Sequence, residues 1–247
     1  MCYNVAYIEK RGAKYAARYQ EIVGEQQVLD FETTELPVSY FLSGFAHPYL
    51  PLVKHNGIDL YAWGLIPFWA KDEAVAKEIR SKTLNAMGET AFEKPSFKRS
   101  MVNKRGLLGV HGFYEWRDVN KVKYPYFIRA RDEEFTSLAC IYEEWINHNT
   151  GEMIPTFSII TTPANSLMQK IHNVKQRMPL IIQRKDEAAW VDPTLNEAAV
   201  KNLIRPFDAD LMVAHPVSQM VNNARNVRDV PEAMQAVEYP ELALLDA

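Results

Sequence analysis

Cysteine is scarce in this sequence, with only two among 247 residues. Two cysteines cannot build the dense disulfide framework of small secreted proteins. The low cysteine content therefore favours a protein of the reducing cytosol. No basic and apolar signal segment opens the chain, and no apolar run approaches the roughly 20 residues that span a bilayer. We therefore expect a cytoplasmic protein that does not contact membranes.

The histidines and glycines also lack the spacing of zinc-binding sites and phosphate-binding loops. The six histidines are scattered, and no Cys or His pair has the spacing of zinc ligands. The ten glycines form no phosphate-cradling loop, and no internal repeat is visible. We therefore expect no metal and no cofactor, in a chain that is a monomer.

The small net charge of −3 conceals two regions of opposite sign. Residues 77–131 hold 13 Lys and Arg against 5 Asp and Glu, whereas residues 186–247 hold 4 against 11. A locally basic middle allows a polyanion to be held on one face, although such blocks are often only solvated surface. With 47% apolar residues the chain can bury a large core, and we predict a single domain over 1–223 followed by an acidic tail over 224–247.

Short apolar and β-branched runs outnumber the helical patterns. Strand-length runs occupy 58–63, 107–111 and 157–162, and helices are expected over 13–23 and 71–82. The charged residues 131–134 separate two further strand-like runs and predict a hairpin. Because strands and helices do not alternate regularly, the pattern favours an α+β fold with a folded-over, mostly antiparallel sheet.

Cys2 is the candidate nucleophile. An aminopeptidase can remove Met1 before so small a residue, which would leave a thiol and a free α-amine on adjacent carbons. These groups titrate near ~8.5 and ~8, so both are partly nucleophilic at neutral pH. Such an aminothiol condenses with an aldehyde to an imine and then closes a thiazolidine ring, or it attacks a carbonyl as an ordinary cysteine does.

Four motifs in a fixed order accompany this cysteine. After Cys2 come Trp-Gly-Leu-Ile-Pro from Trp63, Asn-Ala-Met-Gly-Glu-Thr from Asn85, Gly-Phe-Tyr-Glu-Trp from Gly112, and Ile-His with Arg-Met-Pro over 171–179. In this combination, from Cys2 to about Asn223, the chain resembles the SRAP family, the SOS response-associated peptidases. The resemblance implies a mixed β-pseudobarrel with flanking helices.

The resemblance also implies an activity. Members of the family trap abasic sites in single-stranded DNA through a thiazolidine formed by the processed N-terminal cysteine, in the response to DNA damage, and they process their own N-terminus. The positions that match the family's catalytic residues are Cys2, Asn85, Glu115 and His172. The expected partner is therefore single-stranded DNA that contains abasic sites.

The residue types suit that chemistry. His172, with an ordinary pKa near ~6.5, can move the proton that opens the closed sugar. Aromatic neighbours should raise the pKa of Glu115 and keep part of it protonated, and Asn85 can orient the amine without adding charge. Each also has a structural interpretation: Glu115 could face solvent, and His172 or Asn85 could cap a helix. Cys140, in an apolar run, is expected to be a buried thiol.

A DNA-binding surface is expected beside the catalytic residues. Aromatic side chains could stack on unpaired bases, and basic ones could contact phosphates; these are Trp63, Trp69, Lys94, Lys98, Arg99, Lys104, Arg105 and Arg177. Asn4 and Met87 stand where the family usually has arginine, and residues 174–176 lengthen the interval before Arg177. We therefore expect modest affinity for DNA.

Two other functions fit parts of the sequence. An N-terminal-nucleophile amidase would use a processed Cys2 with its own α-amine as the base. A noncatalytic nucleic-acid-binding module would explain the basic middle and the aromatic residues, but it would leave Cys2, Glu115 and His172 without a role.

Overall fold

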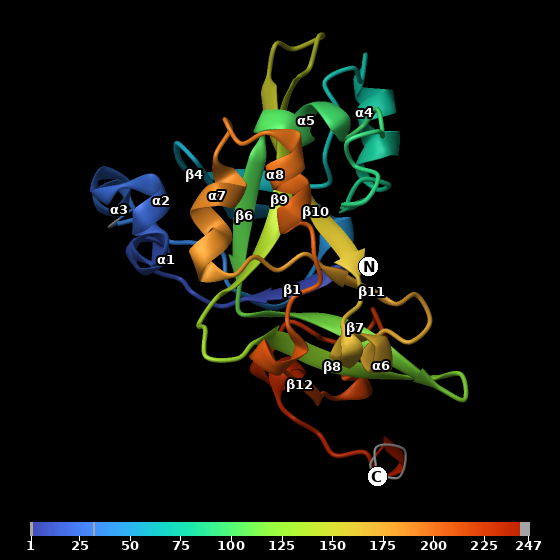
Figure 1. Cartoon of the computed structure of the whole chain (residues 1–247). Coiled ribbons are helices and arrows are strands. Elements are labelled where there is room, and N and C mark those ends of the chain that lie inside the picture. Colours follow the sequence, from blue (N-terminus) through green and yellow to red (C-terminus); the bar gives the residue numbers. More distant parts are fainter. Residues whose placement is uncertain (1, 32, 243–247) are drawn as a thin grey trace.

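Two β-sheets and the helices around them make up the protein in this computed structural model, which describes residues 2–31 and 33–242. Figure 1 shows the sheets one above the other, with strand β1 at their junction. No described helix is long and apolar enough to cross a membrane.

The smaller sheet is antiparallel throughout. Its strands follow the order β12 (Met212–Pro216), β8 (Val122–Ala130), β7 (Gly112–Val119), β1 (Asn4–Tyr7) and β2 (Ser39–Ser43). Strand β1 therefore lies between β7 and β2. This pairing fixes the N-terminal segment alongside β7, the strand that carries the Gly-Phe-Tyr-Glu-Trp motif.

The larger sheet closes on itself. Its order is β11 (Arg177–Pro179), β10 (Met153–Pro163), β4 (Gly57–Trp63), β3 (Tyr49–Lys54), β6 (Arg105–Val110) and β9 (Thr136–Ile146). Strand β9 also pairs with β10, which completes a barrel-like ring, and β5 (Asn85–Met87) joins β10 in parallel. The predicted α+β fold with a folded-over, mostly antiparallel sheet is confirmed.

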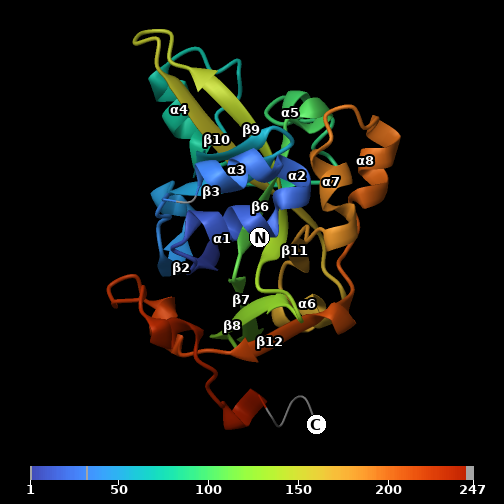
Figure 2. The ribbon, with the colours of Figure 1, turned by 90° about the vertical axis from the view of Figure 1, so that its left-hand side faces the viewer.

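Short helices cover the outside of the barrel. On one side α1, α2 and α3 pack together beside β3 and β6 (Figure 2), and on the other α5, α7 and α8 lie near β6 and β9 (Figure 1). The helices are α1 (Gly12–Arg18), α2 (Gln20–Val23), α3 (Glu25–Asp30), α4 (Glu73–Arg80), α5 (Lys98–Asn103), α6 (Ser166–Ile171), α7 (Glu187–Val191) and α8 (Glu197–Leu203). The predicted helix over 13–23 is broken at Tyr19 and ends at Gly24, whose φ of 81° is one that glycine adopts without strain.

The hairpin predicted around residues 131–134 is wrong. Strand β8 belongs to the smaller sheet and β9 to the larger one, so this loop carries the chain from one sheet to the other. The hairpin lies one strand earlier, where β7 and β8 pair through Asn120 and Lys121, both with positive φ. Left-handed conformations at both turn residues match the twist of paired strands, whereas a charged loop alone does not specify which strands it joins.

Residues 224–242 lie against the domain. Asp229 accepts hydrogen bonds from the backbone N–H of Tyr40 (2.6 Å) and the hydroxyl of Ser39 (3.0 Å), so it holds the end of the chain on β2. Further along, the N–H of Val237 donates to the carbonyl of Pro216. Most of the predicted acidic tail is therefore docked, and its residues 243–247 lie outside the described residues.

Candidate active site

The pairing of β1 with β7 brings Cys2 toward Glu115. Val5 pairs with Phe113 in antiparallel register, so the chain preceding Val5 runs alongside the residues that follow Phe113. Cys2 is fully buried, and Glu115 is only 3% exposed. The register of a single strand pair therefore places a thiol and a carboxyl that are 113 positions apart in the sequence in one buried region.

Asn85 holds the backbone of Cys2. It begins β5, where it pairs with Ile159 of β10, so it lies on a strand rather than at a helix cap. Its Nδ2 donates to the carbonyl of Cys2 at 2.9 Å. Its Oδ1 is buried and has no hydrogen-bond partner among the described residues. One half of the amide thus fixes Cys2, and the other half remains able to accept a hydrogen bond.

His172 follows the last residue of α6 and completes the group. Its Nδ1 lies 2.7 Å from the carbonyl of Arg177, and since a carbonyl only accepts, this nitrogen carries the proton. In the neutral ring Nε2 then bears the lone pair. That nitrogen lies 3.6 Å from Oε2 of Glu115.

Burial moves the pKa values of this pair in opposite directions. The pKa of Glu115 rises to about 7 through burial, against the opposing positive charge of Lys175. Burial is also the main reason why the pKa of His172 falls to about 4. Between these values both groups are neutral. The expected rise for Glu115 is confirmed, whereas the expectation that His172 titrates near neutrality is wrong because its ring is buried.

The Cys2 thiol is also affected by burial. Burial raises its pKa well above the ordinary value, and the nearby Glu115 raises it further. The thiol is therefore protonated at neutral pH and needs an acceptor for its proton before or during attack. Cys140 is the other cysteine, and it is a fully buried thiol of the core as expected.

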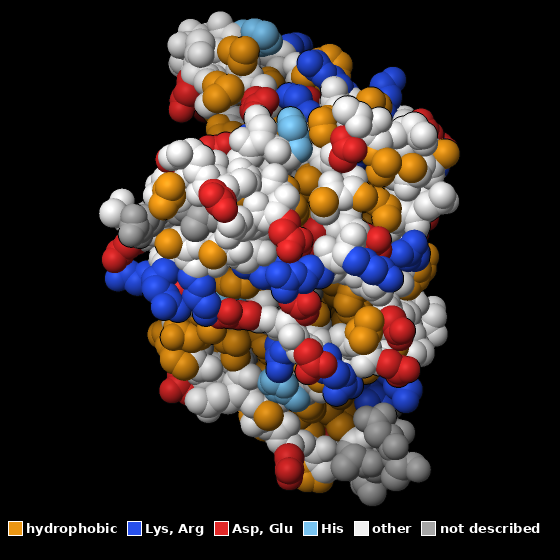
Figure 3. All heavy atoms as spheres, turned by 60° about the vertical axis from the view of Figure 1, so that its left-hand side comes forward, with side chains coloured by type: hydrophobic (Ala, Val, Ile, Leu, Met, Phe, Trp, Pro, Cys, Tyr) orange, Lys and Arg blue, Asp and Glu red, His pale blue; other side chains and the backbone are white. Residues whose placement is uncertain are grey.

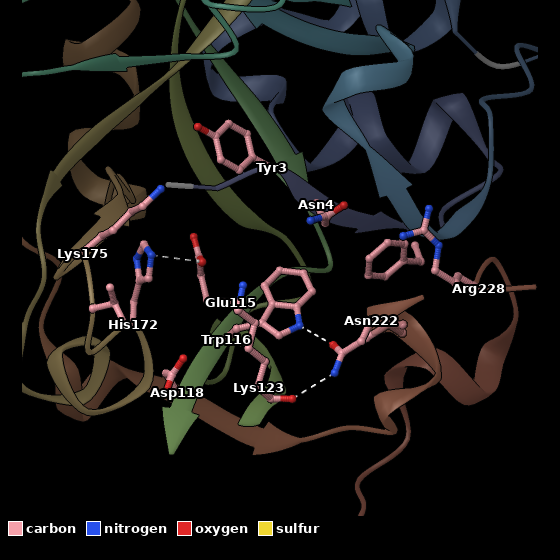
Figure 4. A pocket seen from close by; sticks show the side chains of 13 residues that line it. Tyr3, Asn4, Glu115, Trp116, Asp118, Lys123, His172, Lys175, Asn222 and Arg228 are labelled. Atoms are coloured by element: carbon pink, nitrogen blue, oxygen red, sulfur yellow. Dashed lines mark hydrogen bonds and ion pairs between the residues drawn. The ribbon is translucent and has the colours of Figure 1, made fainter. Parts of the chain in front are cut away.

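Glu115 and His172 open into a cavity of about 630 Å³ (Figure 4). Sequence reasoning missed several of its lining residues, namely Tyr3, Trp116, Asp118, Lys123, Lys175, Asn222 and Arg228. Trp116 belongs to the Gly-Phe-Tyr-Glu-Trp motif, so the sequence could have predicted its place beside Glu115 in the cavity. Asn222 and Arg228 come from the C-terminal segment, and no sequence signal connects them to the cavity. The indole N–H of Trp116 donates to the side-chain oxygen of Asn222 at 2.5 Å, which joins that segment to β7.

Comparison with known sequences identifies the family of this chain. The profile of the family described as SOS response associated peptidase (SRAP) matches residues 7–224. This chain belongs to the SRAP family. The family resemblance found in the sequence motifs is thereby confirmed.

Individual SRAP relatives share much of the chain. Abasic site processing protein YoqW of Bacillus subtilis is 38% identical over 185 residues, which cover 74% of this chain and 78% of that protein. Abasic site processing protein HMCES of Xenopus tropicalis is 33% identical over 198 residues, covering 71% of this chain and 56% of that protein. The crystal structure of a Bacteroides thetaiotaomicron protein, 36% identical, superposes with a TM-score of 0.85 over 96% of this chain and all of that one.

Two of the residues predicted to contact DNA lie in the core of this SRAP domain. Trp63 is fully buried, and its indole N–H donates to the carbonyl of Leu84 at 2.8 Å. Arg105 is 1% exposed and directs its guanidinium at backbone carbonyls, including that of Trp190 at 2.9 Å. Neither side chain reaches solvent, so the prediction that they contact DNA is wrong.

Two more of the predicted cations are already paired. Arg177 donates to both carboxylate oxygens of Glu89 at 2.5 and 2.9 Å. Lys104 lies between Glu143 (2.5 Å) and Glu144 (3.2 Å). Acidic neighbours therefore satisfy these charges within the domain, which weakens the case for either as a phosphate contact.

The remaining predicted DNA residues are accessible. Lys94, Lys98 and Arg99 are exposed, and Trp69 is 42% exposed with its N–H on the carbonyl of Pro95 at 3.1 Å. The guanidinium of Arg99 lies 4.4 Å from the ring centre of Phe68, which is also exposed. Exposed aromatic and basic side chains thus occur together at residues 68–69 and within the segment that runs from Asn85 to α5.

Elsewhere the charges are more evenly balanced. The side of the molecule that carries α1 comes forward in Figure 3, where a band of Lys and Arg side chains has Asp and Glu side chains beside it. In and near α1, Lys10 pairs with Glu35 and Lys14 with Glu9. Such a surface offers a polyanion little net attraction.

Proposed function

We propose that this protein processes abasic sites in single-stranded DNA by forming a covalent thiazolidine link through Cys2. The observation that supports the proposal is a cavity lined by an acid and a base, Glu115 and His172, that are both neutral near pH 6. Cys2, whose carbonyl is held by Asn85, directly precedes Tyr3, which lines the same cavity. The names of the relatives, abasic site processing proteins, point to the same substrate.

Removal of Met1 is the first requirement. It creates the α-amine of Cys2, and peptidase-type self-processing at this bond is part of the proposal. The unpartnered Oδ1 of Asn85 can accept a hydrogen bond from that amine while Nδ2 retains the Cys2 carbonyl. This hydrogen bond orients the lone pair of the Cys2 α-amine for attack, and the neutral amide of Asn85 adds no charge to the site.

The sugar must next expose its aldehyde. An abasic sugar is mostly a closed hemiacetal, so its hydroxyl proton must leave while the ring oxygen gains one. Nε2 of His172 holds a lone pair that can accept the first proton, and protonated Glu115 can supply the second. The two groups lie 3.6 Å apart, so protonated His172 can pass its proton to the Glu115 carboxylate, which returns both groups to their neutral forms.

Bond formation follows in two steps. The amine adds to the aldehyde carbon and one of its protons passes to the former carbonyl oxygen, which gives a carbinolamine. Glu115 protonates the carbinolamine hydroxyl, which leaves as water, so that a protonated imine and the Glu115 carboxylate remain. The sulfur then bonds to the imine carbon, the electron pair of the C=N bond moves to the nitrogen to give a neutral amine, and the thiol proton passes to the Glu115 carboxylate. One water is released overall. Glu115 thus acts first as an acid and then as a base, a dual role that suits a pKa of about 7.

Incubation with a single-stranded oligonucleotide carrying one abasic site, followed by a denaturing gel, tests the proposal. A band that survives denaturation, with a mass equal to protein plus DNA minus one water and minus Met1, is the expected result. Turnover of small amides would favour the N-terminal-nucleophile amidase. Binding that denaturation reverses completely would favour the noncatalytic module.

A further inference from the structure

A short loop between α6 and β11 carries a lysine into the cavity. Lys175 is exposed, lines the cavity, and extends toward the region of Glu115 and His172 in Figure 4. The loop is held by its backbone. The N–H of Gln176 donates to the carbonyl of His172 at 2.8 Å, and the carbonyl of Gln176 accepts from the N–H of Ala164 at 3.0 Å. Lys175 is therefore presented from a fixed turn.

The positive charge of Lys175 acts on both catalytic groups. Burial raises the pKa of Glu115, and Lys175 acts against that rise. Burial lowers the pKa of His172, and Lys175 lowers it further. A single ammonium group that influences both must lie near the place where the sugar reacts.

Two other cations, Lys123 and Arg228, line the same cavity, and the guanidinium of Arg228 lies 4.8 Å from the ring centre of Phe41. Of the cations that the sequence suggested as DNA contacts, Arg177 and Lys104 are neutralised by glutamates, and Arg105 is buried. Lys175 forms no ion pair or hydrogen bond with any side chain that the structure describes. Its charge is therefore available to an anion that enters the cavity.

We propose that Lys175 binds one of the two phosphates that flank the abasic sugar, an inference that rests on the proposed function. A sugar bonded to Cys2 brings both of its phosphates within a few ångströms of the reacting carbon. Asn4, which lines the cavity, and Met87, which ends β5, are both uncharged. An ammonium group is a compact point charge that binds phosphate well. The lengthened loop, whose Asn173 exchanges two hydrogen bonds with the backbone of Asp118 on β7, thus supplies a cation at the edge of the cavity.

Binding is measured with single-stranded DNA that carries a tetrahydrofuran abasic analogue, which has no aldehyde and cannot be crosslinked. Lys175→Gln should weaken binding about tenfold, as expected for one charge-assisted contact, and Lys175→Arg should restore most of the loss. The slope of log affinity against log salt should become shallower by about 0.7, the value for one phosphate on a single strand. The matched control is Lys170→Gln, because Lys170 is an exposed lysine of neighbouring α6 that does not line this cavity.

Two further oligonucleotides identify the phosphate. Each carries a neutral methylphosphonate at one of the two phosphates beside the analogue. When the methylphosphonate replaces the phosphate that Lys175 contacts, the wild-type and Lys175→Gln proteins should bind the oligonucleotide equally well. When it replaces the other phosphate, Lys175→Gln should still bind about tenfold more weakly than wild type. A difference that persists with both, or an equal loss in the Lys170→Gln control, would overturn the inference. Wild-type crosslinking to a true abasic strand is assayed separately, and its absence would contradict the proposed function without affecting the phosphate result.

Discussion

Glu115 and His172 face each other across the cavity with Oε2 and Nε2 3.6 Å apart, and burial keeps both neutral over the same pH range. They come from different parts of the fold, because Glu115 is carried by β7 of the smaller sheet and His172 lies between α6 and β11 of the larger one. A neutral acid beside a neutral base can donate one proton and accept another, and the carboxylate and imidazolium that result lie next to each other as an ion pair.

Cys2→Ser should abolish the denaturation-resistant DNA adduct, because the oxygen analogue closes a much less stable ring than a thiazolidine. The measurement is the fraction of abasic oligonucleotide shifted on a denaturing gel. Cys140→Ser is the matched control, since it makes the same atom change at a buried thiol on β9, and its adduct yield should stay at the wild-type value once folding is verified. Equal adduct yields from the Cys2→Ser and wild-type proteins would refute the assignment of the nucleophile.

Glu115→Gln and His172→Ala should each slow crosslinking by about 10²-fold, the effect of losing a positioned acid or base. In wild type the rate should fall as pH rises through about 7, because Glu115 then loses the proton that it donates. Because the pKa of His172 is about 4, this residue should cause no further change of slope in the pH–rate profile between pH 5 and 8. Single-turnover rates across that range give both results, and a flat profile with undiminished mutant rates would make the two residues structural.

The same carboxyl group should lower the stability of the fold at neutral pH. The pKa of Glu115 is about 7 in the folded protein against an ordinary 4.5, so the unfolded chain loses its proton first and the free energy of unfolding falls as pH rises between these values. The loss is of the order of 3 kcal/mol at about 1.4 kcal/mol per pH unit. Glu115→Gln should therefore be more stable than wild type above pH 7 and similar to it near pH 4.

Chemical denaturation at several pH values measures this difference. The histidine makes an opposite contribution: because folding lowers the pKa of His172 from 6.5 to about 4, the free energy of unfolding falls as pH decreases between these values. A Glu115→Gln protein that is less stable than wild type at pH 8 would show that the carboxylate is a structural group.

Replacing Lys98 and Arg99 with alanine should slow DNA encounter and make the salt dependence shallower. Both residues are exposed, and each phosphate contact on a single strand contributes about 0.7 to the log–log slope. Association rates at several salt concentrations provide the test. Reaction of Cys2 with a small free aldehyde is the control and should not change. A double mutant that keeps the wild-type slope would mean that DNA enters over another surface.

Trp69→Ala and Trp63→Ala should have different consequences. Trp69 is 42% exposed, so its loss should weaken DNA binding by about 1–3 kcal/mol if a base stacks on it, with little change in stability. Trp63 fills the core, and its truncation should lower the free energy of unfolding by about 3–5 kcal/mol. Paired binding titrations and denaturation curves separate the two effects, and unchanged binding by Trp69→Ala would remove it from the DNA path.

The sequence by itself was sufficient for the fold class and for the choice of candidate catalytic residues. Short β-rich runs without regular alternation of strands and helices predicted the α+β sheet, because side-chain periodicity is a local property. The dense motifs around Glu115 and His172 singled out residues that the structure brings within 3.6 Å of each other beside one cavity. Even the raised pKa of Glu115 followed from its aromatic neighbours.

Only the tertiary structure decided which side chains are buried and which charges are free. Trp63 and Arg105 looked like DNA contacts, yet strand pairing turns them inward, and Arg177 is neutralised by a glutamate 88 positions earlier. The pKa of His172 and the availability of Lys175 likewise depend on residues that are distant in sequence or on burial. Burial and pairing arise from long-range packing, which local patterns of residues do not encode.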